Sequence, residues 1–143
     1  MSDLLSANRI GVVVVTHGQL ATELLNAAET IVGDLPQFTA VSIGWHEDVN
    51  DARGDITQAI ERVRGDGGVL LLTDMFGGTP SNLGMTFLEK DRVEVITGVN
   101  LPMLIKLAGL SSSSDLLAVA REMREHGRNA IWVASDLLRG EKT

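Results

Sequence analysis

The sequence predicts an α/β fold, a doubly wound, mainly parallel sheet with helices on both faces. Short apolar runs alternate along the chain with segments whose apolar residues recur at helical spacing. This alternation favours parallel strands joined by crossover helices. The first run, residues 10–16, is rich in valine and stays apolar until its last residue, as expected of a strand that is buried on both faces.

Five strands are predicted from the apolar runs. The first four are residues 10–16, 38–43, 69–73 and 92–97, and the fifth is residues 129–134. The residues that follow the fifth run are expected to form a loose tail.

Helices are predicted between these runs. The first follows Gly18 and ends before Gly33 and Pro36, which are stop signals. The others are residues 51–63, a helix that begins at Thr79 and Pro80, residues 102–110 and residues 115–126. Thr79 is expected to be the N-cap and Pro80 the first helical residue. The serine run 111–114 is interpreted as a turn with a cap.

Length and composition exclude several classes of protein. A chain of 143 residues favours one domain. A formal net charge of −7 argues against nucleic acid as a partner. The absence of cysteine excludes disulfides, thiolate metal sites and a cysteine nucleophile. No apolar run approaches the roughly 18 residues that span a membrane. We therefore expect no membrane insertion, no cofactor or metal, and a cytoplasmic location.

Polar residues and glycines follow three of the strands. They occupy residues 16–18, 74–80 and 98–100. In open parallel sheets, ligands bind at the carboxyl ends of the strands, where the strand order reverses. The three loops are therefore expected to share one rim.

His17 and Asp74 are the predicted catalytic pair. A neutral histidine attacks phosphorus when one ring nitrogen is free and a carboxylate holds the other. Asp74 follows a neighbouring strand and is expected to supply that carboxylate. Gly78, Thr79 and the backbone N–H groups of Ser81 and Asn82 are expected to bind the phosphoryl group at a helix start.

Other polar and aromatic residues receive simpler interpretations. Thr16 and Asn100 are candidate rim residues, although Asn100 is also interpretable as an N-cap alone. His46 and His126 are expected to be structural or solvated. Trp45 and Trp132 are expected to pack, with an interface near Trp45 and His46 as the alternative.

Three segments carry a resemblance to a known family. They are residues 11–18, 74–82 and 98–103. In this order they resemble the mannose-family IIA component of the bacterial phosphoenolpyruvate:sugar phosphotransferase system, and the resemblance runs over about residues 10–135. It implies that His17 is phosphorylated, with Asp74 as its hydrogen-bond partner and Thr79 at the phosphoryl group.

The resemblance also implies a fold and partners. The expected sheet has the order 2-1-3-4, and a C-terminal antiparallel strand, with residues 129–134 as the candidate, is exchanged between the subunits of a homodimer. Residues 1–143 are expected to be a single IIA domain without a fused IIB domain. A phosphorylated HPr-type protein would donate to His17, which would pass the group to a IIB component for sugar uptake or to a regulatory output.

Alternative functions remain at this point. A phosphotransfer subunit serving dihydroxyacetone kinase and a non-transport regulatory phosphoprotein both fit the same motifs. A receiver-type regulator would use Asp74, but Thr16 and His17 stand where its acidic pair belongs. A phosphoglycerate-mutase-like enzyme expects arginine at the position of Thr16, and a flavodoxin-like carrier expects more aromatic residues than this chain has.

Overall fold

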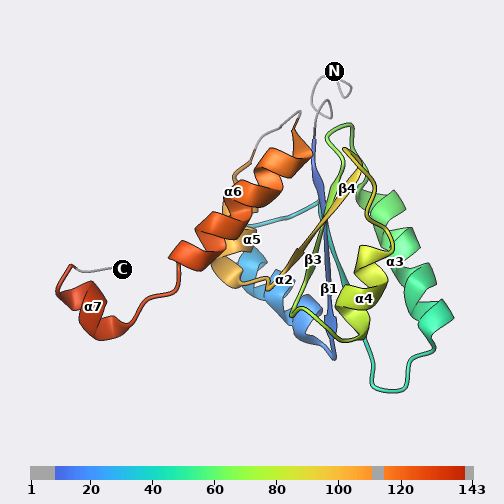
Figure 1. The fold of residues 1–143 in the computed structure, drawn as a ribbon, viewed down its shortest axis with the longest axis horizontal. Helices are drawn as coiled ribbons and strands as arrows, with labels where there is room; N and C mark the ends of the chain where they lie inside the picture. Colours follow the sequence, from blue (N-terminus) through green and yellow to red (C-terminus); the bar gives the residue numbers. More distant parts are fainter. Residues whose placement is uncertain (1–8, 111–114, 141–143) are drawn as a thin grey trace.

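The computed structural model describes residues 9–110 and 115–140. Its sheet has four parallel strands in the order β2-β1-β3-β4 (Figure 1). The strands are β1 (Gly11–His17), β2 (Phe38–Ile43), β3 (Val69–Thr73) and β4 (Val93–Thr97). The predicted fold class and strand order are confirmed, and β2 and β3 have the predicted bounds.

The register of the central strand brings the strand ends together. Val15 of β1 lies beside Val41 of β2 and Thr73 of β3. His17, the last residue of β1, pairs with Ile43, the last residue of β2. Since all four strands are parallel, their carboxyl ends and the loops that follow them lie at one edge of the sheet, called the carboxyl edge below.

Helices cover both faces of the sheet, as predicted. They are α2 (Leu20–Val32), α3 (Val49–Val63), α4 (Thr79–Met85), α5 (Leu101–Ala108), α6 (Leu116–Asn129) and α7 (Ala134–Leu138). Figure 1 shows α2, α5 and α6 on one face and α3 and α4 on the other. Within the described residues, no helix has the length and apolar character that crossing a membrane requires.

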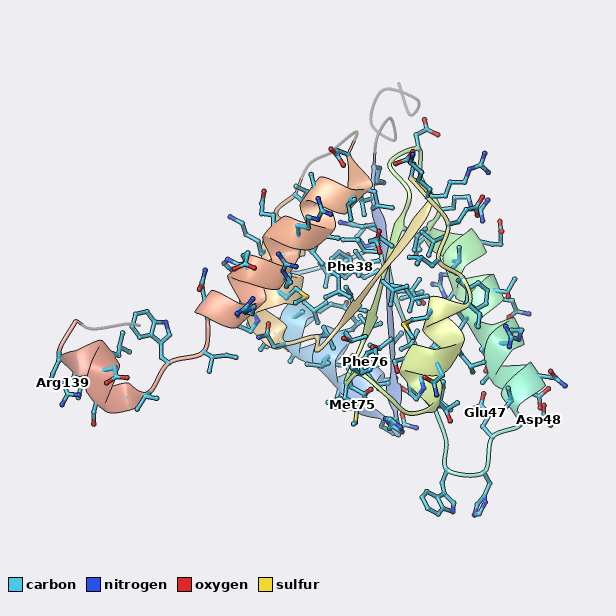
Figure 2. All side chains as sticks on the ribbon, viewed as in Figure 1. Phe38, Glu47, Asp48, Met75, Phe76 and Arg139 are labelled. Atoms are coloured by element: carbon cyan, nitrogen blue, oxygen red, sulfur yellow. The ribbon has the colours of Figure 1, made fainter. Side chains whose placement is uncertain are left out.

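The apolar runs are continuous because both faces of the sheet are buried. Val12 and Val14 belong to the core under α2, α5 and α6, whereas Val13 and Val15 belong to the core under α3. All four are at most 1% exposed. Phe38, at the start of β2, is also buried, and Figure 2 shows it inside the molecule. The side chains of a strand alternate between the faces, so each residue of β1 finds apolar cover.

Side-chain caps set several of the helix starts. α3 begins two residues earlier than predicted because Asp48 caps it, accepting hydrogen bonds from the N–H groups of Asn50 and Asp51. α6 begins after its cap Asp115. The predicted turn at residues 111–114 lies outside the described residues.

The start of α4 corrects one prediction. The N-cap is Gly78, with φ 88°, rather than Thr79. Thr79 and Pro80 are therefore the first and second helical residues. Pro80 is still favourable there, since the first N–H groups of a helix have no intrahelical partner.

The predicted fifth strand is wrong for the single chain that the structure describes. Asn129 ends α6, Ala134 begins α7, and the residues between them form no strand. A strand forms by hydrogen bonding to a neighbouring strand. Figure 1 shows this segment leading away from the sheet, so it has no strand of its own chain beside it. The predicted loose tail is also partly wrong, because it contains α7, which buries none of its residues.

Candidate functional site

His17 and Asp74 meet at the carboxyl edge, as predicted. His17 ends β1, and Asp74 directly follows β3, the neighbouring strand. Asp74 Oδ2 lies 2.8 Å from His17 Nδ1 and accepts the backbone N–H of His17 at 3.0 Å. Its other oxygen, Oδ1, accepts the N–H of Met75 at 2.9 Å. The Asp74 side chain is 14% exposed, whereas the imidazole of His17 is 51% exposed.

The surroundings of Asp74 keep its carboxylate ionised. Burial raises its pKa, but the hydrogen bonds from the backbone and ring of His17, the charge of that ring and the N–H of Met75 outweigh burial. The pKa of Asp74 therefore lies below its ordinary value. An ionised carboxylate only accepts hydrogen bonds, so the proton of a neutral His17 ring is on Nδ1. Nε2 then carries a free lone pair, as a nucleophile requires.

Gly78 faces the free side of this imidazole. A Cβ added at Gly78 would lie 3.1 Å from both Cε1 and Nε2 of His17. Gly78 also has a φ of 88°, a conformation that side chains disfavour. The loop after β3 thus closes on the histidine from two directions, with Asp74 at Nδ1 and Gly78 beside Nε2.

The start of α4 only partly matches the predicted phosphoryl cradle. Thr79 is exposed, and its N–H and that of Ser81 have no intrahelical acceptor. Ser81 is fully buried, and its hydroxyl donates to the carbonyl of Gly78. The expectation for Asn82 is wrong, because its N–H already donates to Gly78 O at 3.0 Å. Asn82 is the first residue far enough from Gly78 to close a helical turn with it.

Thr16 and Asn100 are structural and do not face the rim. Thr16 is fully buried; its hydroxyl accepts the N–H of Ala21 in the first turn of α2. It points away from His17 because adjacent side chains of a strand alternate. Asn100 caps α5 through Met103 N–H and donates Nδ2–H to the carbonyl of Gly127 in α6. Both of its polar atoms are therefore occupied.

The carboxyl edge also exposes apolar side chains that the sequence did not single out as functional. Met75 and Phe76 are 55% and 73% exposed, and Figure 2 shows them beside this edge. Trp45, which was expected to pack, is 91% exposed in the loop after β2. This exposure is compatible with the alternative interpretation, an interface near Trp45 and His46. For Met75 and Phe76, the available signal was a pair of large apolar residues in a glycine-containing loop after a strand.

Three pockets lie away from His17. They are at the outer side of β2 with α3, at the outer side of β4 with α6, and between α5 and α6. Within residues 9–110 and 115–140, no group of three or more histidine, aspartate or glutamate side chains is arranged to hold a metal ion. The imidazole of His17 is half exposed on this rim, so a large partner can reach it.

Comparison with known sequences agrees with this geometry. The family model described as PTS system fructose IIA component, EIIA-man, matches residues 11–123. The fructose-specific EIIA component of Bacillus subtilis is 28% identical over 94% of this chain and 92% of its own length. The sorbose-specific EIIA component of Lacticaseibacillus casei is 32% identical over 68% of this chain and 70% of its own length. The mannose-specific EIIAB component of Escherichia coli is 30% identical over 85% of this chain, which spans 39% of that protein.

Solved structures show the same architecture. The PTS IIA protein associated with the fucose utilization operon of Streptococcus pneumoniae has a TM-score of 0.81 and 25% identity, covering 93% of this chain and 98% of that one. The mannose/sorbose-specific IIA subunit from Enterococcus faecalis has a TM-score of 0.77 and 25% identity, covering 87% and 94%. The chain therefore belongs to the mannose family of IIA components, phosphocarrier proteins of sugar phosphotransferase systems.

Proposed function

We propose that His17 is the phosphorylated residue, accepting a phosphoryl group from a phosphorylated HPr-type protein and passing it to a IIB component. The observation that carries this proposal is the 2.8 Å contact of His17 Nδ1 with Asp74, which leaves Nε2 free. The open position of His17 supports a protein as the donor, since small substrates are usually enclosed in a pocket. The domain core comprises about residues 10–135 of a single IIA domain, and the cytoplasm is its proposed location.

The transfer step needs little from the protein beyond position and charge. The Nε2 lone pair forms a bond to phosphorus while the bond between phosphorus and the donor atom of the phosphorylated protein breaks. The electron pair of that bond returns to the donor atom. Positive charge then develops on the His17 ring, where the Asp74 carboxylate offsets it. Transfer to the acceptor repeats the step with His17 as the leaving group.

Gly78 and Thr79 are the proposed contacts of the transferred group. Gly78 leaves the space beside Nε2 unfilled, because any side chain would begin 3.1 Å from that nitrogen. Thr79 is exposed at the start of α4 and brings a hydroxyl and a backbone N–H. N–H groups at a helix start favour anions through their partial positive charge. Ser81 is limited to its backbone N–H, since its hydroxyl bonds to Gly78.

A homodimer is the proposed assembly, with residues 129–134 exchanged as a strand. β4 is an edge strand, and a groove between it and α6 is lined by residues 94–97 together with Leu117, Arg121 and Arg124. Ile131 and Val133 are 70% and 66% exposed. Being two residues apart, they would share one face of a strand. A strand from a second copy would cover the free edge of β4.

The experiment is intact-mass analysis after incubation with phosphoenolpyruvate, enzyme I and the HPr-type protein of the same organism. We expect the mass of one phosphoryl group to be added to the wild type and to a His46→Ala control, but not to His17→Ala. An undiminished addition to His17→Ala would overturn the proposed site. Subsequent transfer to dihydroxyacetone kinase subunits, instead of a IIB protein, would overturn the proposed acceptor.

A further inference from the structure

The turn of residues 44–47, between β2 and α3, carries the most exposed aromatic side chain among the described residues. Trp45 is 91% exposed, and its ring meets His46 edge-on, with centroids 5.8 Å apart and planes at 83°. In Figure 2 this turn projects from the molecule beside the labelled Glu47 and Asp48. Trp45 therefore contributes little to the core of the chain.

Hydrogen bonds hold this turn in a defined shape. Gly44 N–H donates to the Glu47 carboxylate at 3.2 Å, and Glu47 N–H donates to the carbonyl of Gly44 at 3.2 Å. Asp48 follows at once and caps α3. The turn is thus tied to itself and to a helix start. A large aromatic residue on an ordered turn loses little conformational freedom when a partner binds, which favours it as an interface anchor.

The strand order places Trp45 on one flank of His17 and a second apolar group on the other. β1 lies between β2 and β3. Gly18 N–H donates to the carbonyl of Ile43 at 2.9 Å, so the loops after β1 and β2 start side by side. Met75 and Phe76 follow β3 on the opposite flank. A protein that brings a reactive group to Nε2 of His17 meets exposed apolar side chains on both sides.

The charges near Trp45 indicate the chemistry of that protein. Glu47 belongs to the turn, Asp48 and Asp51 lie at the start of α3, and Glu23 lies in the first turn of α2. The chain as a whole is acidic, with a formal net charge of −7. An acidic surface around an aromatic side chain fits a basic surface with an apolar pocket. Basic side chains also make strong hydrogen bonds to phosphate, so a phosphorylated donor is expected to present them beside its phosphoryl group.

We propose that Trp45 is a docking anchor for the phosphoryl-donating protein and sets the affinity for that donor without taking part in the chemistry. This inference rests on the proposed phosphorylation of His17. The expected partner surface is an apolar pocket for the indole, flanked by lysine or arginine side chains that face Glu47 and Asp48.

The test separates docking from chemistry. Trp45→Ala and Trp45→Phe are compared with wild type at varied concentrations of the phosphorylated HPr-type protein. We expect Trp45→Ala to raise KM for this donor about tenfold, with kcat unchanged and Trp45→Phe between the two. Phosphorylation of His17 by phosphoramidate, a small donor without a docking surface, should be the same in all three proteins. Leu88→Ala, which removes a 56% exposed side chain after α4, is the matched control.

Each outcome has a defined meaning. An unchanged KM in Trp45→Ala overturns the inference, and so does a change confined to transfer from phosphorylated His17 to the IIB acceptor. Equal losses with the protein donor and with phosphoramidate also overturn it, because they show that Trp45 affects His17 itself. A wild-type protein that accepts no phosphoryl group from the donor overturns the proposed function instead.

Discussion

The carboxyl edge around His17 and the C-terminal segment of residues 130–140 both expose apolar side chains, but they differ in what holds them. At the edge, Asp74 accepts three N–H groups and fixes His17. In the C-terminal segment, Ile131, Val133 and Leu138 are at least 66% exposed, and α7 buries nothing. Figure 2 shows this helix, with the labelled Arg139, apart from the sheet.

The difference shows which parts of the molecule find their contacts within a single chain and which leave apolar side chains exposed. The contacts that hold His17 and Asp74 all come from within the chain, so the geometry of this pair does not depend on a second molecule. The C-terminal segment keeps a contiguous set of apolar side chains without cover, which is typical of an interface. The following predictions test two points. The first is whether phosphorylation depends on the geometry around His17, and the second is whether the C-terminal segment mediates self-association.

The largest expected effect is on the rate of phosphorylation in Asp74→Asn. An asparagine no longer offsets the positive charge of the ring and can hold the wrong tautomer, so we expect the rate to fall by about 10²–10⁴-fold. The measurement is rapid-quench phosphorylation by the phosphorylated HPr-type protein. Asp66→Asn, which removes a charge from the turn before β3, at the opposite edge of the sheet, should stay close to wild type. An unchanged rate in Asp74→Asn would remove Asp74 from the mechanism.

The same variant has an expected pH dependence. The pKa of Asp74 is lower in the folded state than its ordinary value of 3.8. Its contribution to stability is therefore present above the unfolded pKa and is lost as the pH falls through the folded one. Urea unfolding from about pH 5 to about pH 2 should show a smaller loss of stability in Asp74→Asn than in wild type. Parallel curves for the two proteins would contradict this linkage.

Self-association should depend on the C-terminal segment. We expect Ile131→Asp with Val133→Asp to weaken the proposed dimer by about 100-fold, because charges would replace the apolar face of the exchanged strand. Sedimentation velocity over a concentration series measures the change. Leu138→Asp, in α7 and outside residues 129–134, is the control for added charge. A wild-type chain that stays monomeric throughout would contradict the exchange.

A pair of glycines tests how closely the loop must approach His17. Gly77 and Gly78 both have a positive φ, but an added Cβ meets His17 only at Gly78. We expect each alanine variant to lose about 1–3 kcal/mol of stability. Only Gly78→Ala should be slower in phosphorylation, by about tenfold, since the methyl group crowds Nε2. Equal rates in the two variants would show that this approach is not needed.

The smallest expected effect concerns two buried threonines. Thr16 and Thr73 are both fully buried, but Thr16 Oγ1 is hydrogen-bonded, whereas Thr73 Oγ1 has no partner among the described residues. We expect Thr16→Val to lose about 1–2 kcal/mol in urea unfolding, and Thr73→Val to be neutral or more stable by about 1 kcal/mol. A destabilised Thr73→Val protein would show that its hydroxyl has a partner, such as a buried water.

Much of the fold was predictable because two buried faces leave a clear pattern. The unbroken valine run of β1 and the stop at Gly33 gave the class and several boundaries. Boundaries failed where a cap decided them, as at Asp48 and Gly78. The fifth strand failed for a different reason: apolar content in residues 129–134 indicates a need for cover but does not identify the neighbour.

The candidate site was predictable to a similar degree. His17 and Asp74 follow adjacent strands, so their proximity comes from the topology, and the 2.8 Å contact agrees with it. The roles of Thr16 and Asn82 were not predictable, because a hydrogen bond from the start of α2 decides the first and a hydrogen bond at the start of α4 decides the second. The N-cap interpretation of Asn100 is confirmed, whereas its hydrogen bond to Gly127 in α6 was not predicted.

By itself, the sequence determined the order of strands and helices from β1 to α6 and the residue types at the strand ends, because both depend on local apolar spacing and local chemistry. Only the tertiary structure decided which atoms of those residues are free. His17 keeps Nε2 open because Asp74 occupies Nδ1, and Asn100 is unavailable because α5 and α6 use both of its polar atoms. The exposure of Trp45 was decided in the same way, since burial depends on what the rest of the chain brings near a side chain.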